Sequence, residues 1–105
     1  PLVGVSFETF VIEEILKGLE STMLTNWHPH YYRTRNGAEI DLILEGPFGV
    51  LPIEIKYGTS TRLRHLMSLS HFVKEHDLPL GILINQSQSI EWLDSKILQV
   101  PVNYI

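Results

Sequence analysis

A chain of 105 residues, 44% of them hydrophobic, can bury the core of one small domain and is too short for two, so we expect residues 1–105 to form a single domain. It has no cysteine, which excludes disulfides, thiolate metal sites and cysteine nucleophiles and fits a cytoplasmic protein. The net charge of −4 counts against strong independent binding of nucleic acid, and no apolar run reaches the roughly 20 residues that span a membrane.

The first periodic segment, Phe7 to Leu19, carries its apolar residues on one broad face at helical spacing and predicts a helix. Ser6 is the expected N-cap, and Gly18 lies near the expected end. Residues 31–35 predict a short strand, and the following Asn36-Gly37 is a dipeptide typical of a tight hairpin turn.

Two strictly alternating segments follow, 39–45 and 50–57, with the turn Gly46-Pro47-Phe48-Gly49 between them. Each segment predicts a strand with one wholly apolar face, except that Tyr57 adds a hydroxyl group to this face of the second strand. The polar faces carry Glu39, Asp41, Ile43 and Glu45 on the first strand, and Val50, Pro52, Glu54 and Lys56 on the second.

The second half predicts a helix that Thr59-Ser60-Thr61 can cap and that runs to about Asp77. Residues 80–84 predict a strand covered on both faces, and another strand is expected near 100–104. The order helix, three antiparallel strands, helix, strand predicts an α/β fold in which helices flank a mixed sheet.

The two alternating strands must place their apolar faces on the same side of the sheet, because a slip of one residue would bury the charges. With residues 46–49 as the loop, Glu45 pairs with Val50. Asp41 is then expected opposite Glu54, and Glu39 opposite Lys56.

Carboxylates that face each other repel unless a positive charge lies between them. A hard divalent cation with oxygen ligands would supply that charge. Lys56, on the same side as Glu54, can hold an attacking water or stabilise a phosphorane-like transition state. Together with a metal, the group fits phosphodiester hydrolysis. From the two strands alone, the alternative of a solvated sheet face with cross-strand salt bridges is favoured.

Glu8 falls near the middle of the apolar face of the first helix, where an ionised carboxylate needs a partner or a metal. This placement favours a role in the polar site. The alternative is that Glu8, in the expected first turn, serves the helix N-terminus.

These residues resemble the PD-(D/E)XK nuclease superfamily, through Asp41, twelve intervening residues and then Glu54-Ile55-Lys56. More narrowly, the chain is similar to the uncharacterised domain at the C-terminus of many prokaryotic AAA+-type ATPases. The segments that carry this similarity are Gly4-Val5-Ser6-Phe7-Glu8, Glu14-Ile15-Leu16, Tyr32-Arg33-Thr34, Gly37 to Asp41 and Ile53 to Lys56.

The resemblance implies a restriction-endonuclease-like core in which Asp41 and Glu54 bind Mg²⁺ or Mn²⁺, with the Ile55 carbonyl as a further ligand. It suggests Lys56 as the catalytic lysine, Glu8 as a glutamate that completes the site and Glu39 as an accessory carboxylate. It also implies a fragment of a longer protein, with ATP bound by an N-terminal ATPase module. Ile40 departs from the proline of the superfamily name, and the second helix lacks the glutamine motif of exonuclease branches.

Other candidates have plainer interpretations, which we favour. His28-Pro29-His30 could supply metal ligands but lacks a third nearby, which favours a loop. Arg33 and Arg35 could contact phosphates, but a two-residue Asn36-Gly37 turn would place them on the face opposite the site. Structural or edge-strand roles are therefore favoured for these arginines. Arg62 and Arg64, with His65, could contact phosphates of nucleic acid, against the alternative of a solvated helix face.

The remaining histidines and the tryptophans also have ordinary expected roles. His71 and His76 are expected at the surface, while Trp27 and Trp92 are expected to anchor packing. No glycine-rich phosphate loop is present in the sequence, so ATP would have to bind elsewhere.

Two functions follow from these patterns. The first is a Mg²⁺- or Mn²⁺-dependent nuclease acting on DNA that the attached ATPase or a partner presents. The second is an interaction or homo-oligomerisation module that regulates the ATPase with little or no catalysis, which the acidic net charge favours.

Overall fold

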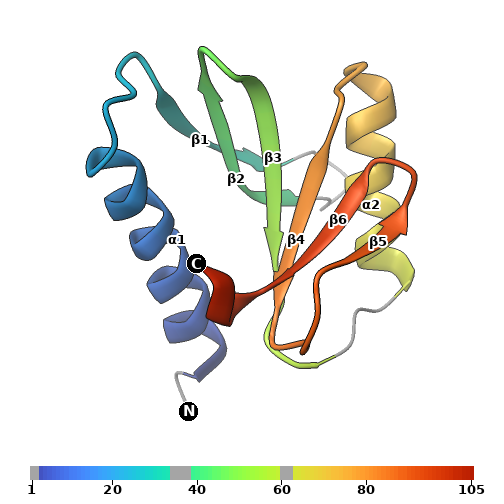
Figure 1. Ribbon diagram of the computed structural model, residues 1–105. Helices are drawn as coiled ribbons and strands as arrows, with labels where there is room; N and C mark the ends of the chain where they lie inside the picture. Colours follow the sequence, from blue (N-terminus) through green and yellow to red (C-terminus); the bar gives the residue numbers. More distant parts are fainter. Residues whose placement is uncertain (1–2, 34–38, 60–62) are drawn as a thin grey trace.

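The computed structural model describes residues 3–33, 39–59 and 63–105, without the side chains of residues 3–6, 32, 33 and 39 (Figure 1). Within these residues, two α-helices and a short 3₁₀ helix accompany a six-stranded mixed sheet, which confirms the expected α/β fold. The elements are α1 (Val3–Glu20), β1 (His28–Arg33), β2 (Glu39–Gly46), β3 (Gly49–Ile55), α2 (Leu63–Glu75), β4 (Gly81–Asn85), β5 (Glu91–Asp94), β6 (Ile97–Pro101) and η1 (Val102–Tyr104).

The sheet has the strand order β1-β2-β3-β4-β6-β5. Strands β1, β2 and β3 form an antiparallel meander, β4 joins parallel to β3, and β6 joins parallel to β4. Strand β5 returns antiparallel to β6 and forms one edge of the sheet, with β1 at the other. The carboxyl ends of β3, β4 and β6 therefore lie together at one end of the sheet.

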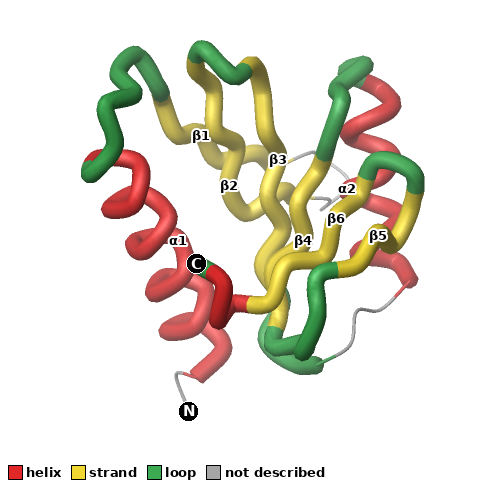
Figure 2. The backbone as a smooth tube through the Cα atoms, in the orientation of Figure 1, coloured by secondary structure: helices red, strands yellow, loops and turns green. Residues whose placement is uncertain are grey.

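The two helices cover opposite faces of the sheet (Figure 2). On the α1 face, Val11 packs with buried residues of β2, β3 and β4, among them Leu42, Ile53 and Ile84. On the α2 face, Leu69 and its helical neighbours pack with Leu83 and the rest of a second cluster. Burial on both faces gives the central strand β4 its nearly continuous apolar run.

Helix α1 begins at Val3, four residues before the expected start at Phe7. Ser6 therefore lies inside the helix and is not its N-cap, as the sequence had suggested. Serine has only modestly lower helix propensity than the best formers, so it does not interrupt a helix whose apolar face is packed. Glu8 consequently lies beyond the first turn, which contains no acidic residue.

Strand β1 starts at His28, so the expectation that His28-Pro29-His30 forms a loop is wrong. Proline is tolerated here because β1 is an edge strand, where a missing backbone N–H can point away from the ladder. The expected Asn36-Gly37 turn and Arg35 lie outside the described residues, as does the Arg33 side chain.

The β2–β3 hairpin has the expected register, with Glu45 opposite Val50. Its loop is tighter than expected, because Gly46 pairs with Gly49 and only Pro47 and Phe48 form the turn. Gly49 has a φ of 98°, a left-handed conformation that favours glycine.

The C-terminal third differs most from expectation. Helix α2 ends at Glu75, two residues early, and the serine and second threonine of the expected Thr59-Ser60-Thr61 cap lie outside the described residues. Strand β4 is confirmed, whereas the single strand expected near residues 100–104 is replaced by β5 and β6. Periodicity does not predict β6 because Gln99 interrupts its apolar pattern while remaining buried in the fold.

Replacing Gly81 by alanine is expected to destabilise the protein by about 1–3 kcal/mol, as overpacking of a core usually does. An added Cβ would lie 2.9 Å from Val73 Cγ2 and 3.0 Å from Ile97 Cδ1, and both of these side chains are buried. Urea unfolding would measure the loss. Gly18→Ala is the control, because no atom lies within 4 Å of its added Cβ and a helical alanine is expected to stabilise slightly. Equal effects of the two substitutions would contradict this account of the β4 packing.

Candidate functional site

The site begins with a β-bulge in β2. His30 of β1 pairs with Ile43, and Tyr32 pairs with Ile40, so β2 holds one residue more than β1 over this stretch. Such an extra residue re-aims the side chains beside it. Ile40 consequently packs on the α2 face while Leu42 packs on the α1 face, which corrects the strict alternation expected across residues 40–44.

The bulge turns Asp41 toward β3 at the point where the β2–β3 ladder ends. The last paired residues are Leu42 and Ile53, and beyond them Asp41 Oδ2 accepts a hydrogen bond of 2.7 Å from the backbone N–H of Ile55. A side-chain carboxylate thus replaces the next rung of backbone pairing. This contact places the Asp41 carboxyl against the backbone of Ile55, whose chain neighbours are Glu54 in β3 and Lys56 directly after it.

Asp41 brings together the acidic residues expected at the site. Its carboxyl is hydrogen-bonded to the side chain of Glu54 and to the side chain of Glu8. Glu54 and Asp41 therefore meet across the hairpin as the register predicted, and α1 contributes the third carboxyl. Because Glu8 lies beyond the first turn of α1, the alternative role at the helix N-terminus does not fit its position.

Glu54 is buried, with 3% of its surface exposed. Its neighbours Ile53 and Ile55 face α1, so Glu54 is on the α2 face beside its β4 partner Leu83. Among the described residues, its Oε1 has no hydrogen-bond partner. The alternative of a solvated sheet face with salt bridges is therefore wrong for Glu54. Its buried carboxylate oxygen needs a cation or a hydrogen-bond donor as a partner.

Burial is the largest cause of a raised pKa at Asp41, followed by its hydrogen bond to Glu54 and the repulsion from that carboxyl. The Ile55 N–H and Glu8 act in the opposite direction, and the pKa of Asp41 rises from 3.8 to about 7. Near neutral pH, Asp41 is thus partly protonated and can donate to Glu54. A bound cation would favour release of that proton.

A pH-dependent stability difference is expected between the wild type and Asp41→Asn in the absence of metal. Because the pKa of Asp41 is higher in the folded chain, its contribution to stability is complete below pH 3.8 and is lost as the pH rises through about 7. Asparagine cannot ionise and can still accept from Ile55, so Asp41→Asn should gain about 4 kcal/mol on the wild type between pH 4 and 8, since each pKa unit corresponds to about 1.4 kcal/mol. Urea unfolding at both pH values, with EDTA present, measures this gain.

Asp94→Asn is the control, because its effect on stability is expected to change with pH in the opposite direction. The Ser95 backbone N–H and then the Ser70 hydroxyl lower the pKa of Asp94 in the folded chain. Its stabilising contribution is therefore present above the unfolded pKa and is lost as the pH falls. Asp94→Asn should be less stable than the wild type at neutral pH, and a gain with rising pH at both positions would contradict the site description.

Lys56 is the first residue after β3 and is partly buried. Its backbone N–H donates to the Ile84 carbonyl over 2.9 Å, which continues the β3–β4 pairing past Ile55. Within the described part of the chain, the Lys56 side chain is in no ion pair with a carboxylate. Its expected partner across the hairpin, the Glu39 side chain, lies outside the described residues, and so does Arg62.

The carboxylates suit a hard cation that keeps part of its water shell. Among the described residues, no group of three or more histidine, aspartate or glutamate side chains is arranged to hold a metal ion. Mg²⁺ is commonly held by one or two carboxylates together with water and substrate oxygens. Asp41 and Glu54 meet that requirement, with the unpartnered Glu54 Oε1 as the observation that favours it. Glu8 and the Ile55 carbonyl as further ligands stay predictions.

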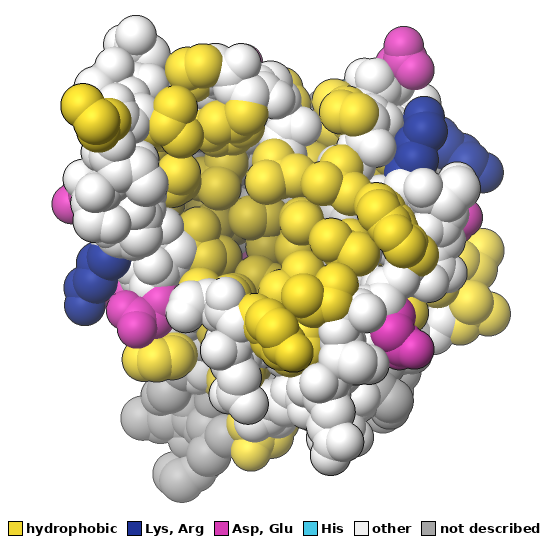
Figure 3. Space-filling model, in the orientation of Figure 1, with side chains coloured by type: hydrophobic (Ala, Val, Ile, Leu, Met, Phe, Trp, Pro, Cys, Tyr) yellow, Lys and Arg dark blue, Asp and Glu magenta, His cyan; other side chains and the backbone are white. Residues whose placement is uncertain are grey.

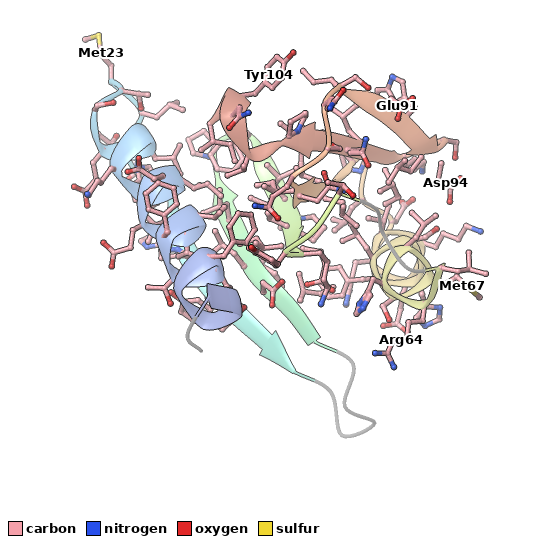
Figure 4. The ribbon with its side chains drawn as sticks, turned by 90° about the horizontal axis from the view of Figure 1, so that it is seen from below. Met23, Arg64, Met67, Glu91, Asp94 and Tyr104 are labelled. Carbon is pink, nitrogen blue, oxygen red and sulfur yellow. The ribbon has the colours of Figure 1, made fainter. Side chains whose placement is uncertain are left out.

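The other candidate residues lie apart from this acidic group. His30 pairs with Glu45 over 3.1 Å at the exposed edge of the sheet. Arg64 projects from α2 away from the sheet (Figure 4), so it has not been brought toward the acidic group. Trp92, expected to anchor packing, is 63% exposed, because the strand that carries it lies at the edge of the sheet.

His71 and His76 are exposed at the surface, as expected. His71 lies 3.4 Å from Glu75 on α2, and the ring of His76 makes an edge contact with Phe72. Trp27 is partly buried, with its Cβ close to Gly46.

Asn85 and Gln99 form a second polar group, which the sequence patterns do not predict. Both are buried, and the Asn85 amide donates to Gln99 Oε1 over 3.1 Å. The available signal was two amide residues within otherwise apolar segments, but only the parallel pairing of β4 with β6 brings them together.

The protein is thus an α/β domain with a mixed sheet, and a buried pair of carboxyls lies in it where the pairing of β2 with β3 ends. The chain belongs to the DUF4143 family, a domain of unknown function, whose model matches residues 3–105. No curated protein matches the chain significantly. None of the helices in the described residues has the length and apolarity needed to span a membrane.

Proposed function

We propose that this domain is a divalent-metal-dependent nuclease of the PD-(D/E)XK type, which hydrolyses phosphodiester bonds in DNA. The observation that carries the proposal is the buried contact between Asp41 and Glu54, with Lys56 two residues after Glu54. The order of helix, three antiparallel strands, helix and strand agrees with the core that the superfamily resemblance implies. An AAA+-type ATPase in the same protein is part of the proposal and rests on the resemblance alone.

Asp41 and Glu54 would hold Mg²⁺ or Mn²⁺, and the bound cation supplies stabilisation of the negative charge that develops on the phosphate. The Ile55 N–H and Glu8 orient the Asp41 carboxylate toward the shared position. Lys56 would hold the attacking water or donate to a phosphate oxygen through its ammonium group. An acidic site of this kind accepts a phosphodiester only with the cation present, because carboxylates and phosphates otherwise repel each other.

The test is cleavage of supercoiled and linear DNA, double- and single-stranded, by the purified protein in EDTA, Mg²⁺ or Mn²⁺. We expect cleavage with either cation and none in EDTA. Asp41→Asn should abolish it, whereas Asp94→Asn, an aspartate on the distant strand β5, should retain it. Equal cleavage by wild type and Asp41→Asn would identify a contaminating nuclease and overturn the proposal, as would no cleavage by the wild type under all conditions.

A second candidate, an interaction module, is favoured by the exposed apolar surface on the α1 face. Figure 3 displays hydrophobic side chains gathered around a hollow between α1 and the β4–β6–β5 half of the sheet. Register aligns Ile53, Ile82, Leu98 and Trp92 across four strands. Phe10 and Tyr104 are 56% and 62% exposed. Sedimentation of wild type and Trp92→Ser tests self-association through this face, which the nuclease proposal does not require.

A further inference from the structure

The α2 face of the sheet connects Glu54 with a second polar region. Strand pairing aligns Glu54 with Leu83, Leu83 with Gln99, and Gln99 with Glu91, so one row of side chains crosses four strands. Neighbouring strands lie about 4.8 Å apart, which places Gln99 roughly 10 Å from Glu54 along the row. The carboxylate of the proposed catalytic site and the buried amide of Gln99 therefore lie on the same face.

A hollow of about 620 Å³ opens beside this row, at the carboxyl ends of β3 and β4. Two hydrogen bonds join Gly58 and Gln86 at one end of the hollow. The Gly58 N–H donates to Gln86 Oε1, and the Gln86 N–H donates to the Gly58 carbonyl. The next residues, Thr59 and Ser87, both line the hollow. Its volume is within the usual range of small-ligand sites, and its position at the carboxyl ends of parallel strands is a common one for ligands in open α/β sheets.

The Gln99 amide holds two acceptors of the hollow in place, the Ser89 carbonyl and the Glu91 carboxylate. Gln99 Nε2 donates to the Ser89 carbonyl over 3.2 Å and to Glu91 Oε2 over 3.3 Å, while Asn85 occupies Gln99 Oε1. Glu91 keeps its other carboxylate oxygen for a ligand. Among the described residues, the Ser87 hydroxyl oxygen is buried without a hydrogen-bond partner.

The charge and the shape of the hollow limit the class of ligand that it can bind. None of the described residues that line the hollow is basic, so these residues offer no cation to a free phosphate. Leu66 and Leu93 add apolar walls on the α2 side. A flat ring that donates a hydrogen bond from an amino group matches apolar walls and a carboxylate acceptor, as carboxylates do when they accept from cytosine. Glu91 is exposed, so a ligand can approach its carboxylate from solvent (Figure 4).

We propose that this hollow binds an amino-bearing nucleobase, cytosine or adenine in preference to thymine, from a single-stranded segment whose phosphate lies at the acidic group. The proposal rests on the proposed nuclease function for its choice of nucleic acid, and it deepens that function by naming single-stranded DNA as the substrate. Thymine presents a carbonyl where cytosine presents an amino group, so the Glu91 carboxylate would repel it.

The test uses free nucleosides and the ¹⁵N-labelled protein in EDTA, so it reads binding without cleavage. Titration with deoxycytidine and with deoxyadenosine should shift the backbone amide signals of Ser87, Ser89 and Glu91. Thymidine should bind about tenfold more weakly, consistent with the 1–3 kcal/mol of a good base contact. Glu91→Gln, which retains an acceptor for Gln99, should remove the preference, while Glu13→Gln on the exposed side of α1 should retain it.

Each outcome is decisive. Amide shifts that are confined to this region, with tighter binding of deoxycytidine than of thymidine, support the base site even if the protein cleaves no DNA. Cleavage of single-stranded DNA by the same protein is measured in parallel with Mn²⁺ present. Equal shifts for the nucleosides, shifts located elsewhere, or an unchanged preference in Glu91→Gln would overturn the base site, and DNA cleavage in that case would leave the nuclease proposal standing.

Discussion

Replacing Lys56 by alanine is expected to lower metal-dependent DNA cleavage by at least about a hundredfold. The reason is that a single donor aimed at developing charge in a water-poor site contributes on this scale to the rate of the chemical step. Lys56 directly follows β3, and its backbone is held by the 2.9 Å hydrogen bond to Ile84, so the substitution removes the ammonium group without releasing the strand. The measurement is the single-turnover rate of plasmid nicking at saturating Mn²⁺.

Two comparisons separate this effect from loss of the fold. Lys17→Ala removes a lysine from the exposed side of α1, where it lies 4.0 Å from Glu14, and should cleave at the wild-type rate. Lys56→Ala should still be stabilised by Mn²⁺, because Asp41 and Glu54 are unchanged. Wild-type nicking by Lys56→Ala would remove this lysine from the mechanism while leaving the metal proposal in place.

Binding of Mn²⁺ is expected to raise the thermal midpoint of the wild type by about 10 °C or more at a hundredfold excess over the dissociation constant. A ligand that binds only the folded state at that excess contributes about 2.7 kcal/mol, and one kcal/mol moves a domain of this size by several degrees. The physical source is relief of the repulsion between two carboxyls in contact, one of which is 3% exposed. Differential scanning calorimetry with and without Mn²⁺ measures the shift.

Glu54→Gln should abolish this stabilisation, since an amide is a poor ligand for a hard cation and only Asp41 of the two proposed metal ligands keeps its carboxylate. The same variant should unfold at a higher temperature than the wild type in EDTA, because a buried unpartnered carboxylate oxygen becomes part of a neutral group. Glu45→Gln is the control on the neighbouring strand, since Glu45 is exposed and contacts His30. An equal shift by Mn²⁺ in Glu54→Gln and in the wild type would place the cation elsewhere.

Glu54→Gln is expected to raise stability in EDTA and to abolish the stabilisation by Mn²⁺, and these opposite effects connect stability with function. A buried acidic pair is unfavourable to the folded chain alone, and a cation that binds only the folded form would reverse that balance. The raised pKa of Asp41 follows from the same repulsion and burial. Stability in EDTA, its pH dependence and its response to Mn²⁺ therefore report on one group of carboxyls by three independent measurements.

The sequence alone determined the β2–β3 hairpin and thereby the meeting of Asp41 with Glu54. Alternation of apolar and polar residues has period two, and a short turn leaves few registers that keep both apolar faces on one side. Glu45 pairs with Val50 as that reasoning required. The helices and the buried strand β4 were also predictable, because their apolar patterns are local and strong.

Only the tertiary structure decided how deeply the site is buried and what surrounds it. The bulge at Asp41 depends on pairing with β1, and the contact with Glu8 depends on where α1 packs against the sheet. Asn85 meets Gln99 because β4 and β6 run parallel, although fourteen positions separate them in the chain. These features arise from contacts between segments distant in sequence, which hydrophobic periodicity within a single segment does not encode.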